Sequence, residues 1–374
     1  MLQSLLDSQD IGVSLDGNNS WDPRIRNERF YERVLREGRL GAAESYMDGR
    51  WECSNLPELF YRLLSSGFDQ KLYELPALRF LESLRRFGMG LWNRQTKERS
   101  LAVGEVHYDD RVFQTAALGD RMVASCAYYD RGASTLDEAQ DHKMALICEK
   151  LYLEDGHRLL DIGCGWGTLM HYAESTRALR AIGLTISRDQ QEYARKRYPE
   201  KNLEFLLEDY RDFKASAGSF ERVVSVGMLE HVGKKNYPTY FNRVRHFLAE
   251  DGLFLLHSIV GRQRENGTDP FIDKYIFPNG ELPTMAEILE SVEGTFVVED
   301  LHNLGTNYEW TLRAWRENLQ LRWSDIVAAH GMRTARMYEY YLAISEAAFR
   351  SRTLNVVQIV LSPRGKRGGY RSIR

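Results

Sequence analysis

Three glycines follow an apolar run at regular spacing within residues 157–173. The order is Asp161, Gly163, Gly165 and Gly167, and a helical pattern comes next. In open α/β folds, ligands bind beyond the carboxyl ends of the strands, where a glycine-rich turn lets the backbone approach them closely. The segment therefore predicts a ligand site between a strand and a helix.

The spacing of this loop matches neither of two phosphate-binding loops. A dinucleotide loop reads GxGxxG and a phosphate loop ends in GK[ST], whereas this one reads DIGCGWG and contains no Lys or Arg. An acidic residue before the glycines suits a ligand with a positive end, such as the sulfonium of S-adenosylmethionine. A tight structural turn is the alternative interpretation, and the succession of strand, loop and helix favours a methyltransferase.

The next strand ends in the sequence GLTISRDQQ. Nucleotide-binding α/β folds usually place an acidic residue there to bind the ribose hydroxyls. Here Thr185 and Gln190 must take that role. They can hydrogen-bond a neutral ribose, with less charge assistance.

The elements that must position these residues form an α/β pattern after about residue 105. Helical stretches separate most of seven predicted strands, which read RLLDIG, RAIGLT, LEFLLED, RVVSVG, LFLLHSI, FVVEDLHN and NVVQIVLS. A long Gly/Pro-punctuated insertion at 261–284 is typical of a lid or substrate loop. We predict a Rossmann-like α/β catalytic domain over 106–374 and a smaller, mainly helical domain over 1–105.

Composition sets the broad class of the protein. A chain of 374 residues is longer than a single hydrophobic core usually allows. Its content of 43% hydrophobic and 28% charged residues is typical of a globular protein, and it has no apolar run of about 18 residues that could span a bilayer. The first residues lack the basic region of a secretory signal, so we expect a cytoplasmic protein. The four cysteines show no paired spacing, so we expect neither a metal site nor disulfides. The net charge of -3 argues against a nucleic-acid partner.

Two basic stretches stand out against that average, at 78–99 and in the final segment RGKRGGYRSIR. One interpretation is that 78–99 forms a core-facing helix with a solvated basic face and that the final segment is a frayed terminus. The other is contact with anionic lipid headgroups.

Motifs along nearly the whole chain resemble the bacterial cyclopropane-fatty-acyl-phospholipid synthases. They are ESYMDGRWE, SCAYYD, LDIGCGWG, GLTIS, RVVSVGMLEHVG, LLHSI, DKYIFPNGELP and NYEWTLRAW. The related mycolic acid cyclopropane synthases generally lack the N-terminal domain. The resemblance implies that S-adenosylmethionine donates a methylene group to the cis double bond of an unsaturated acyl chain in a membrane phospholipid. The substrate is thus a lipid of the bilayer, reached by a protein bound peripherally to its inner face.

The resemblance also implies a base, which in this family is a bound bicarbonate ion. Its ligands carry over by motif as Cys126, Glu230, His257, Ile259 and Tyr308. His257, Tyr308 and the backbone N–H groups of Cys126 and Ile259 would donate hydrogen bonds to the ion, and Glu230 would accept its hydrogen. Aromatic faces stabilise cations. The tyrosines near the motifs that could stabilise a cation on the acyl chain in this way are Tyr128, Tyr275 and Tyr308.

The cofactor residues implied by the resemblance lie in five segments. They are Tyr108, Ser125, Asp161, Gly163, Gly165, Trp166, Thr185, Gln190, Asp209 and Tyr210. The last two would flank the adenine.

Each of these residues also has a plainer interpretation. Cys126 could be a small core residue, His257 a hydrogen-bonded strand histidine, and Glu230 part of a helix start. Three other functions stay open: a fatty acyl methyltransferase that adds a methyl branch without ring closure, a catalytically silent lipid-binding protein, and a nicotinamide oxidoreductase. The glycine spacing disfavours the last. A homodimer is also left open.

Overall fold

The computed structural model describes residues 2–7, 11–68, 111–264 and 268–374. It divides the chain into two compact units. Unit 1 comprises Met1–Trp92, Asn266–Pro278 and Tyr308–Leu354, and unit 2 comprises Asn93–Glu265, Asn279–Asn307 and Asn355–Arg374. No helix among the described residues is both long and apolar enough to cross a bilayer.

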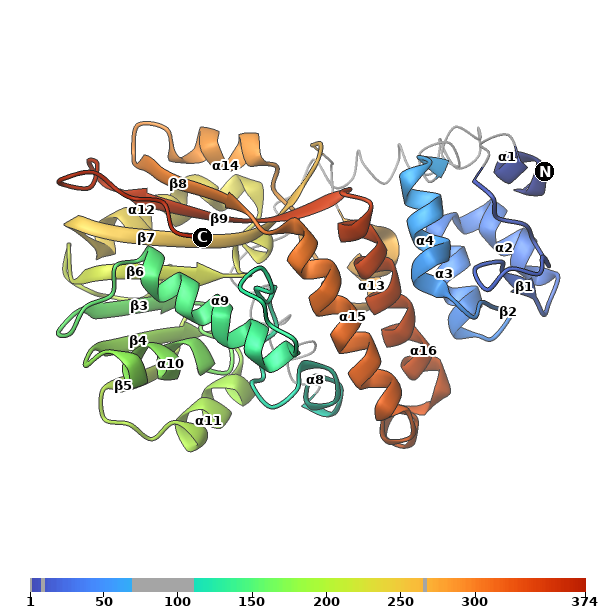
Figure 1. The fold of residues 1–374 in the computed structure, drawn as a ribbon, viewed down its shortest axis with the longest axis horizontal. Helices are drawn as coiled ribbons and strands as arrows, with labels where there is room; N and C mark the ends of the chain where they lie inside the picture. Colours follow the sequence, from blue (N-terminus) through green and yellow to red (C-terminus); the bar gives the residue numbers. More distant parts are fainter. Residues whose placement is uncertain (1, 8–10, 69–110, 265–267) are drawn as a thin grey trace. The chain divides into compact units, whose positions relative to one another are not determined.

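Unit 2 is built on a seven-stranded sheet with the order β5-β4-β3-β6-β7-β9-β8 (Figure 1). The strands are β3 (Arg158–Ile162), β4 (Arg180–Thr185), β5 (Leu203–Leu207), β6 (Phe220–Val226), β7 (Leu248–Gly261), β8 (Val297–Asn303) and β9 (Leu354–Ser362). The pairs β3/β4, β4/β5, β3/β6 and β6/β7 are parallel, and β8/β9 is antiparallel. The chain leaves β3 toward β4 on one side and returns to β6 on the other. The carboxyl edge of β3 is therefore a switch point, where α/β folds bind ligands.

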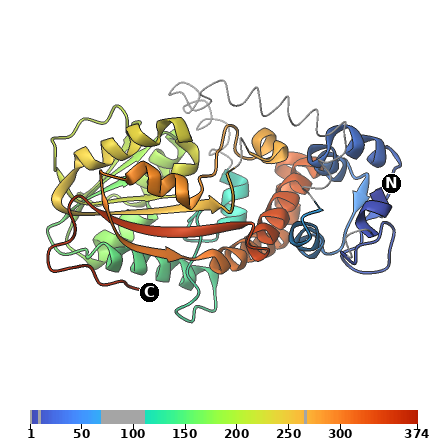
Figure 2. The same ribbon diagram turned by 90° about the horizontal axis from the view of Figure 1, so that it is seen from above.

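Helices cover both faces of this sheet. Those of unit 2 are α8 (Arg111–Leu118), α9 (Leu136–Lys150), α10 (Thr168–Thr176), α11 (Arg188–Arg197), α12 (Tyr237–Phe247) and α14 (Met285–Val292). Figure 2 shows α12 and α14, in yellow and orange, on one face, and α9 and α10, in green, on the other. Short 3-10 turns at Leu229–His231 and Lys234–Asn236 precede α12. The predicted α/β methyltransferase fold is confirmed.

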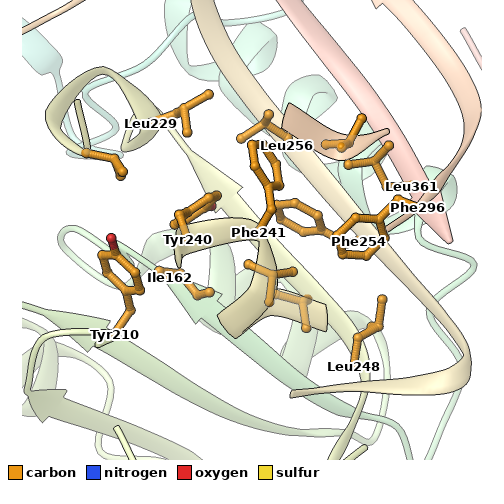
Figure 3. Close-up of a cluster of buried hydrophobic side chains, with 14 of the residues drawn as sticks. Ile162, Tyr210, Leu229, Tyr240, Phe241, Leu248, Phe254, Leu256, Phe296 and Leu361 are labelled. Carbon is orange, nitrogen blue, oxygen red and sulfur yellow. The ribbon is translucent and has the colours of Figure 1, made fainter. Parts of the chain in front are cut away.

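An aromatic core fills the space between the sheet and α12. Tyr240 and Phe241 of α12 pack against Phe254 of β7, and Phe296 lies beside them (Figure 3). These side chains are almost completely buried. A second cluster on the other face joins Ile147 of α9 to the sheet. Burial of this kind contributes about 1.5–3 kcal/mol for each large side chain.

Unit 1 is mainly helical. Its elements are α1 (Leu2–Asp7), β1 (Arg24–Ile25), α2 (Arg29–Glu37), α3 (Arg39–Met47), β2 (Trp51–Glu52), α4 (Leu56–Ser65), α13 (Pro270–Tyr275), most of α15 (Gly305–Leu321), and α16 (Trp323–Arg350). Tyr340 of α16 lies at the centre of the core. Its ring contacts Phe60 and Phe271 at centroid distances of 4.8 and 4.9 Å. At Gly331, φ is 79° and the helical geometry of α16 is interrupted.

This division differs from the boundary expected near residue 105. The C-terminal helix α16 completes the core of unit 1, because its apolar face packs on α3 and α4. The 261–284 insertion also differs from the expected lid. Phe271 is 1% exposed in the core of unit 1, and Asp269 caps α13 by accepting from the backbone N–H of Phe271. The basic segment 78–99 lies outside the described residues.

The final basic segment is held against unit 2 instead of fraying. Arg364 and Arg367 pair with Glu250 and Asp251 at 3.0 and 3.1 Å. The Arg374 guanidinium binds Asp300 at 2.7 Å. These arginines are therefore already neutralised by the protein.

Candidate active site

The glycine loop connects β3 to α10 at the carboxyl edge of the sheet. Gly163, Gly165 and Gly167 all have positive φ, at 86°, 54° and 86°. A Cβ atom at Gly167 would lie 2.7 Å from the Phe205 ring, so this glycine permits close packing of the loop on β5. A Cβ atom at Gly165 would meet nothing within 4 Å. The loop therefore exposes bare backbone at Gly165, as a bound ligand requires.

Asp161 ends β3 beside this loop and is 2% exposed. Burial raises the pKa of its carboxyl to about 7, and the nearby Lys143 ammonium opposes the shift. Its Oδ1 atom has no hydrogen-bond partner among the described residues. An acceptor in this state suits a ligand that brings hydrogen-bond donors or positive charge.

Thr185 and Gln190 form a small network at the end of β4. The Thr185 hydroxyl donates to Gln190 Oε1 at 2.9 Å and accepts from the backbone N–H of Ser187 at 3.2 Å. Ser187 in turn caps α11 by accepting from the backbone N–H of Gln190 at 3.2 Å. The two predicted ribose residues are thus brought together and held in fixed orientations.

The remaining cofactor residues have protein partners. The Trp166 indole N–H donates to Gln114 Oε1 at 2.8 Å. Asp209 is bound by the Arg211 guanidinium at 2.6 Å. The Tyr210 ring packs edge-on against Tyr240 within the aromatic core (Figure 3). Its side chain is therefore a core element, and burial raises its pKa to about 12.

Glu230 lies in the turn after β6, next to the end of β7. Its Oε1 accepts from the backbone N–H of Ile259 at 2.6 Å. Its Oε2 has no hydrogen-bond partner among the described residues. Burial raises the pKa of Glu230 to about 7, and the Ile259 hydrogen bond opposes that shift. In this structure Ile259 therefore holds Glu230, where the sequence predicted that its N–H would bind an ion.

His257 lies on β7, opposite Val226 of β6, and is 2% exposed. Its Nδ1 lies 3.3 Å from Gln358 Nε2, and it accepts a hydrogen bond from that amide in the tautomer that carries its proton on Nε2. Burial lowers the pKa of His257 well below its usual value, and the charges of Lys143 and Lys150 lower it further. His257 is therefore a neutral imidazole with one N–H to donate.

Cys126 is fully buried in the loop before α9, and its thiol donates to the Ala127 carbonyl at 3.2 Å. The neighbouring Ser125 hydroxyl accepts from the Lys143 ammonium at 2.9 Å. The sequence interpretation missed Lys143, because a lysine within a helix normally faces water. Gln140, Lys143 and Lys150 occupy the same helical stripe as the buried Ile147, and all four are 2% exposed or less.

Two predicted residues stand apart from the others. Tyr108 lies outside the described residues. Tyr308 belongs to unit 1, where its ring packs on Phe349 at 4.5 Å and Trp315 at 5.9 Å. Tyr275 also belongs to unit 1, and its hydroxyl donates to Glu44 Oε1 at 2.7 Å.

The residues of unit 2 fit the implied groups. Gly165 leaves space for a cofactor, and Asp161 offers an acceptor to its positively charged end. Glu230 Oε2 offers a second acceptor, which suits the O–H of a bicarbonate ion, and neutral His257 offers a donor. The arrangement can therefore bind a cation and a small hydrogen-bonding anion along one edge of the sheet.

Comparisons with known proteins agree with this geometry. The sequence profile of the mycolic acid cyclopropane synthetase family matches residues 95–359. The cyclopropane-fatty-acyl-phospholipid synthase of Escherichia coli K12 is 44% identical over 365 residues, covering 97% of this chain and 93% of that protein.

Two solved structures show the same likeness. The cyclopropane synthase MmaA2 of Mycobacterium tuberculosis is 31% identical, with a TM-score of 0.66, and the match covers 70% of this chain and 97% of that one. The mycolic acid cyclopropane synthase CmaA1, complexed with SAH and CTAB, is 30% identical with a TM-score of 0.65 and the same coverage.

Proposed function

The chain belongs to the mycolic acid cyclopropane synthetase family of S-adenosylmethionine-dependent enzymes, and from this premise we propose that it forms cyclopropane rings in membrane phospholipids. The ring would form at the cis double bond of an unsaturated acyl chain. One observation carries the proposal: the glycine loop and the buried pair Glu230 and His257 lie at the carboxyl ends of the adjacent strands β3, β6 and β7. A methyl donor and a base can therefore act on the same carbon.

S-adenosylmethionine, when bound, supplies the methyl group, and bicarbonate supplies the base that removes one proton from it. The backbone at Gly165 would approach the cofactor, and Asp161 would accept a hydrogen bond from the ammonium group of its methionine part. Thr185 and Gln190 orient the ribose. Burial strengthens each of these electrostatic contacts, because no water competes for the donors and acceptors.

The position of the bicarbonate base depends on protein groups that accept a hydrogen bond from it or donate one to it. Glu230 Oε2 accepts the hydrogen of the anion, which turns the other oxygens toward the acyl chain. The His257 Nε2–H donates to one of those oxygens, while Ile259 fixes Glu230 from behind. Cys126 completes the proposed set within unit 2, and Tyr308 is the further ligand that the family resemblance implies. Cys126, His257 and Glu230 are at most 5% exposed, so water that would trap the acyl-chain cation is excluded from their surroundings.

We further propose that the protein meets its substrate at the inner face of the membrane, as a cytoplasmic protein bound peripherally. The N-terminal domain over 1–105 would supply the surface contact. Segment 78–99 has the basic and apolar pattern that suits an anionic leaflet. The final basic segment is a poorer candidate, since acidic residues of unit 2 pair with three of its arginines.

The test is turnover with defined lipids. Purified protein, S-adenosylmethionine and vesicles of monounsaturated phospholipid should give S-adenosylhomocysteine and an acyl chain heavier by one CH2 that has lost its double bond. Saturated vesicles should give neither product. A methyl-branched chain would instead identify the fatty acyl methyltransferase, and methyl transfer to nucleic acid or soluble molecules alone would reject the assignment.

A further inference from the structure

A buried ammonium lies next to the loop that carries Ser125 and Cys126. Lys143, in the middle of α9, is 2% exposed, and its Nζ donates to Ser125 Oγ at 2.9 Å. One helical turn earlier, Gln140 Nε2 donates to the Ser125 carbonyl at 3.0 Å. Helix α9 therefore holds this loop through two side chains, one of which carries a full charge.

A buried ammonium is costly unless an opposite charge offsets its lost hydration. Lys150, two turns along the same helix, satisfies this rule, because its Nζ lies 3.4 Å from Asp300 Oδ2. Among the described residues, Lys143 has one hydrogen-bond partner, the neutral Ser125 hydroxyl. Burial lowers the pKa of Lys143 to about 8, so the group stays mostly charged at pH 7.

The field of this ammonium reaches the proposed ligand sites. It lowers the pKa of Asp161 against the effect of burial, and it lowers the pKa of His257 in the same direction as burial. Lys143 also interacts electrostatically with Cys126. One cation thus acts on the cofactor side and the anion side of the site.

The charges of the proposed site require such a cation. Asp161 and Glu230, each with a pKa raised to about 7, are both partly ionised at neutral pH, bicarbonate adds a further negative charge, and His257 is neutral. The sulfonium cofactor offsets one charge, and it becomes neutral at sulfur once the methyl group has moved. The anion must remain bound at that stage to take the proton.

We propose that Lys143 is a positioning residue, which holds the Ser125–Cys126 loop and supplies the positive charge that keeps bicarbonate bound after methyl transfer. This role rests on the proposed function. It falls to Lys143 and not to Lys150, the other buried lysine of α9, because the Lys150 ammonium already pairs with Asp300 at 3.4 Å.

The test measures bicarbonate binding directly, using carbon-13 bicarbonate and NMR on the full-length protein saturated with S-adenosylhomocysteine. Lys143→Met should raise the bicarbonate Kd at least tenfold. Lys143→Arg keeps the charge and should stay within threefold of the wild type. The matched control is Lys150→Met on the same helix, which leaves Asp300 paired with Arg374 and should change the bicarbonate Kd less than twofold.

Two outcomes would overturn the role: an unchanged bicarbonate Kd in Lys143→Met, or an equal loss in both Lys143 variants. If Lys143→Met does not fold, Ser125→Ala decides, since it keeps the charge and removes the anchor. It should weaken bicarbonate binding three- to fivefold, and no change would overturn the proposal. Lipid turnover is assayed separately, so a wild-type protein that binds bicarbonate yet makes no cyclopropane lipid would refute the proposed function, whereas failure of the Lys143 proposal would show in the bicarbonate Kd values alone.

Discussion

Glu230 is a proposed ligand of the base, and its burial favours the protonated form of its carboxyl group. Its pKa, raised by burial to about 7, means that the native protein holds the Glu230 proton more tightly than the unfolded chain does. This contribution to the unfolding free energy is fully present below 4.5, the ordinary pKa of a Glu carboxyl, and is lost as the pH rises through 7. Glutamine at this position cannot titrate and keeps a donor and an acceptor.

We therefore expect Glu230→Gln to flatten the dependence of stability on pH. Between pH 5 and pH 8 the wild type should lose about 2 to 3 kcal/mol more unfolding free energy than the variant, from a shift of this size in one group. Urea denaturation at several pH values measures the difference. Asp161 titrates in both the wild type and the variant, so its contribution cancels from the difference between them. Parallel curves of unfolding free energy against pH would show that Glu230 ionises normally.

The same residues should separate turnover from cofactor affinity. Glu230→Gln, His257→Ala and Tyr308→Phe should each lower kcat at least tenfold and leave the Kd for S-adenosylhomocysteine within about twofold, because they act after the methyl group has moved. Thr185→Ala should do the reverse. It loses the hydrogen bond donated to Gln190 Oε1 and the one accepted from the Ser187 N–H, which should weaken binding about 3- to 10-fold. Calorimetric titration beside a turnover assay distinguishes these patterns, and equal effects on both quantities in all four variants would contradict them.

The sequence places the candidate residues whose motif is local, and it does not show those whose surroundings depend on packing. The loop glycines and Asp161 follow from one short segment. Lys143 does not, because a lysine within a helix normally faces water, and only the tertiary contact with Ser125 shows otherwise. The burial of Tyr210 in the core is equally a product of packing against α12.

Within the β3–α10 loop, two glycines should respond differently to the same substitution. Gly165→Ala should weaken S-adenosylhomocysteine binding at least tenfold and cost only about 1 to 2 kcal/mol of stability, the strain of a left-handed residue, because its Cβ meets open space. Gly167→Ala adds a clash with Phe205 and should cost more stability. Thermal unfolding and calorimetric titration of both variants provide the comparison, and loss of binding without loss of stability in Gly167→Ala would reverse the assignment.

All seven strands were predictable, since short β-branched runs between helical stretches are unambiguous in an α/β domain. The run RAIGLT coincides with β4. The burial of Phe271 within the 261–284 insertion was not predictable, because glycine and proline signal turns but do not show that this side chain enters the core of unit 1.

For the whole molecule, unit 1 depends on residues from opposite ends of the chain. Tyr340→Ala should lower the unfolding free energy by about 3 to 5 kcal/mol, the usual cost of removing a buried aromatic ring. Leu321→Ala is the control, since Leu321 is 85% exposed and a surface change usually costs less than about 0.5 kcal/mol. Chemical denaturation tests both, and similar losses would place Tyr340 outside the stabilising core.

The boundary near residue 105 could not be corrected from the sequence. Helical patterns in 308–354 resemble those of any α/β crossover, and nothing local shows that they pack on α3 and α4. Deletion of the first 92 residues should consequently expose the apolar face of α16, including Met337 and Ala343. The truncated protein should aggregate or bind a hydrophobic dye, and a stable, non-binding fragment would contradict this.

The discontinuous composition of unit 1 also has a consequence for protein synthesis. Trp51 and Phe60 leave the ribosome early, but the helix that buries them ends only at residue 350. At about 5 to 20 residues per second, the interval between residues 92 and 354 lasts roughly 13 to 50 s. Throughout that time the nascent chain carries an incomplete apolar core. A chaperone that shields the emerging N-terminal helices should therefore be needed until translation of α16 is finished.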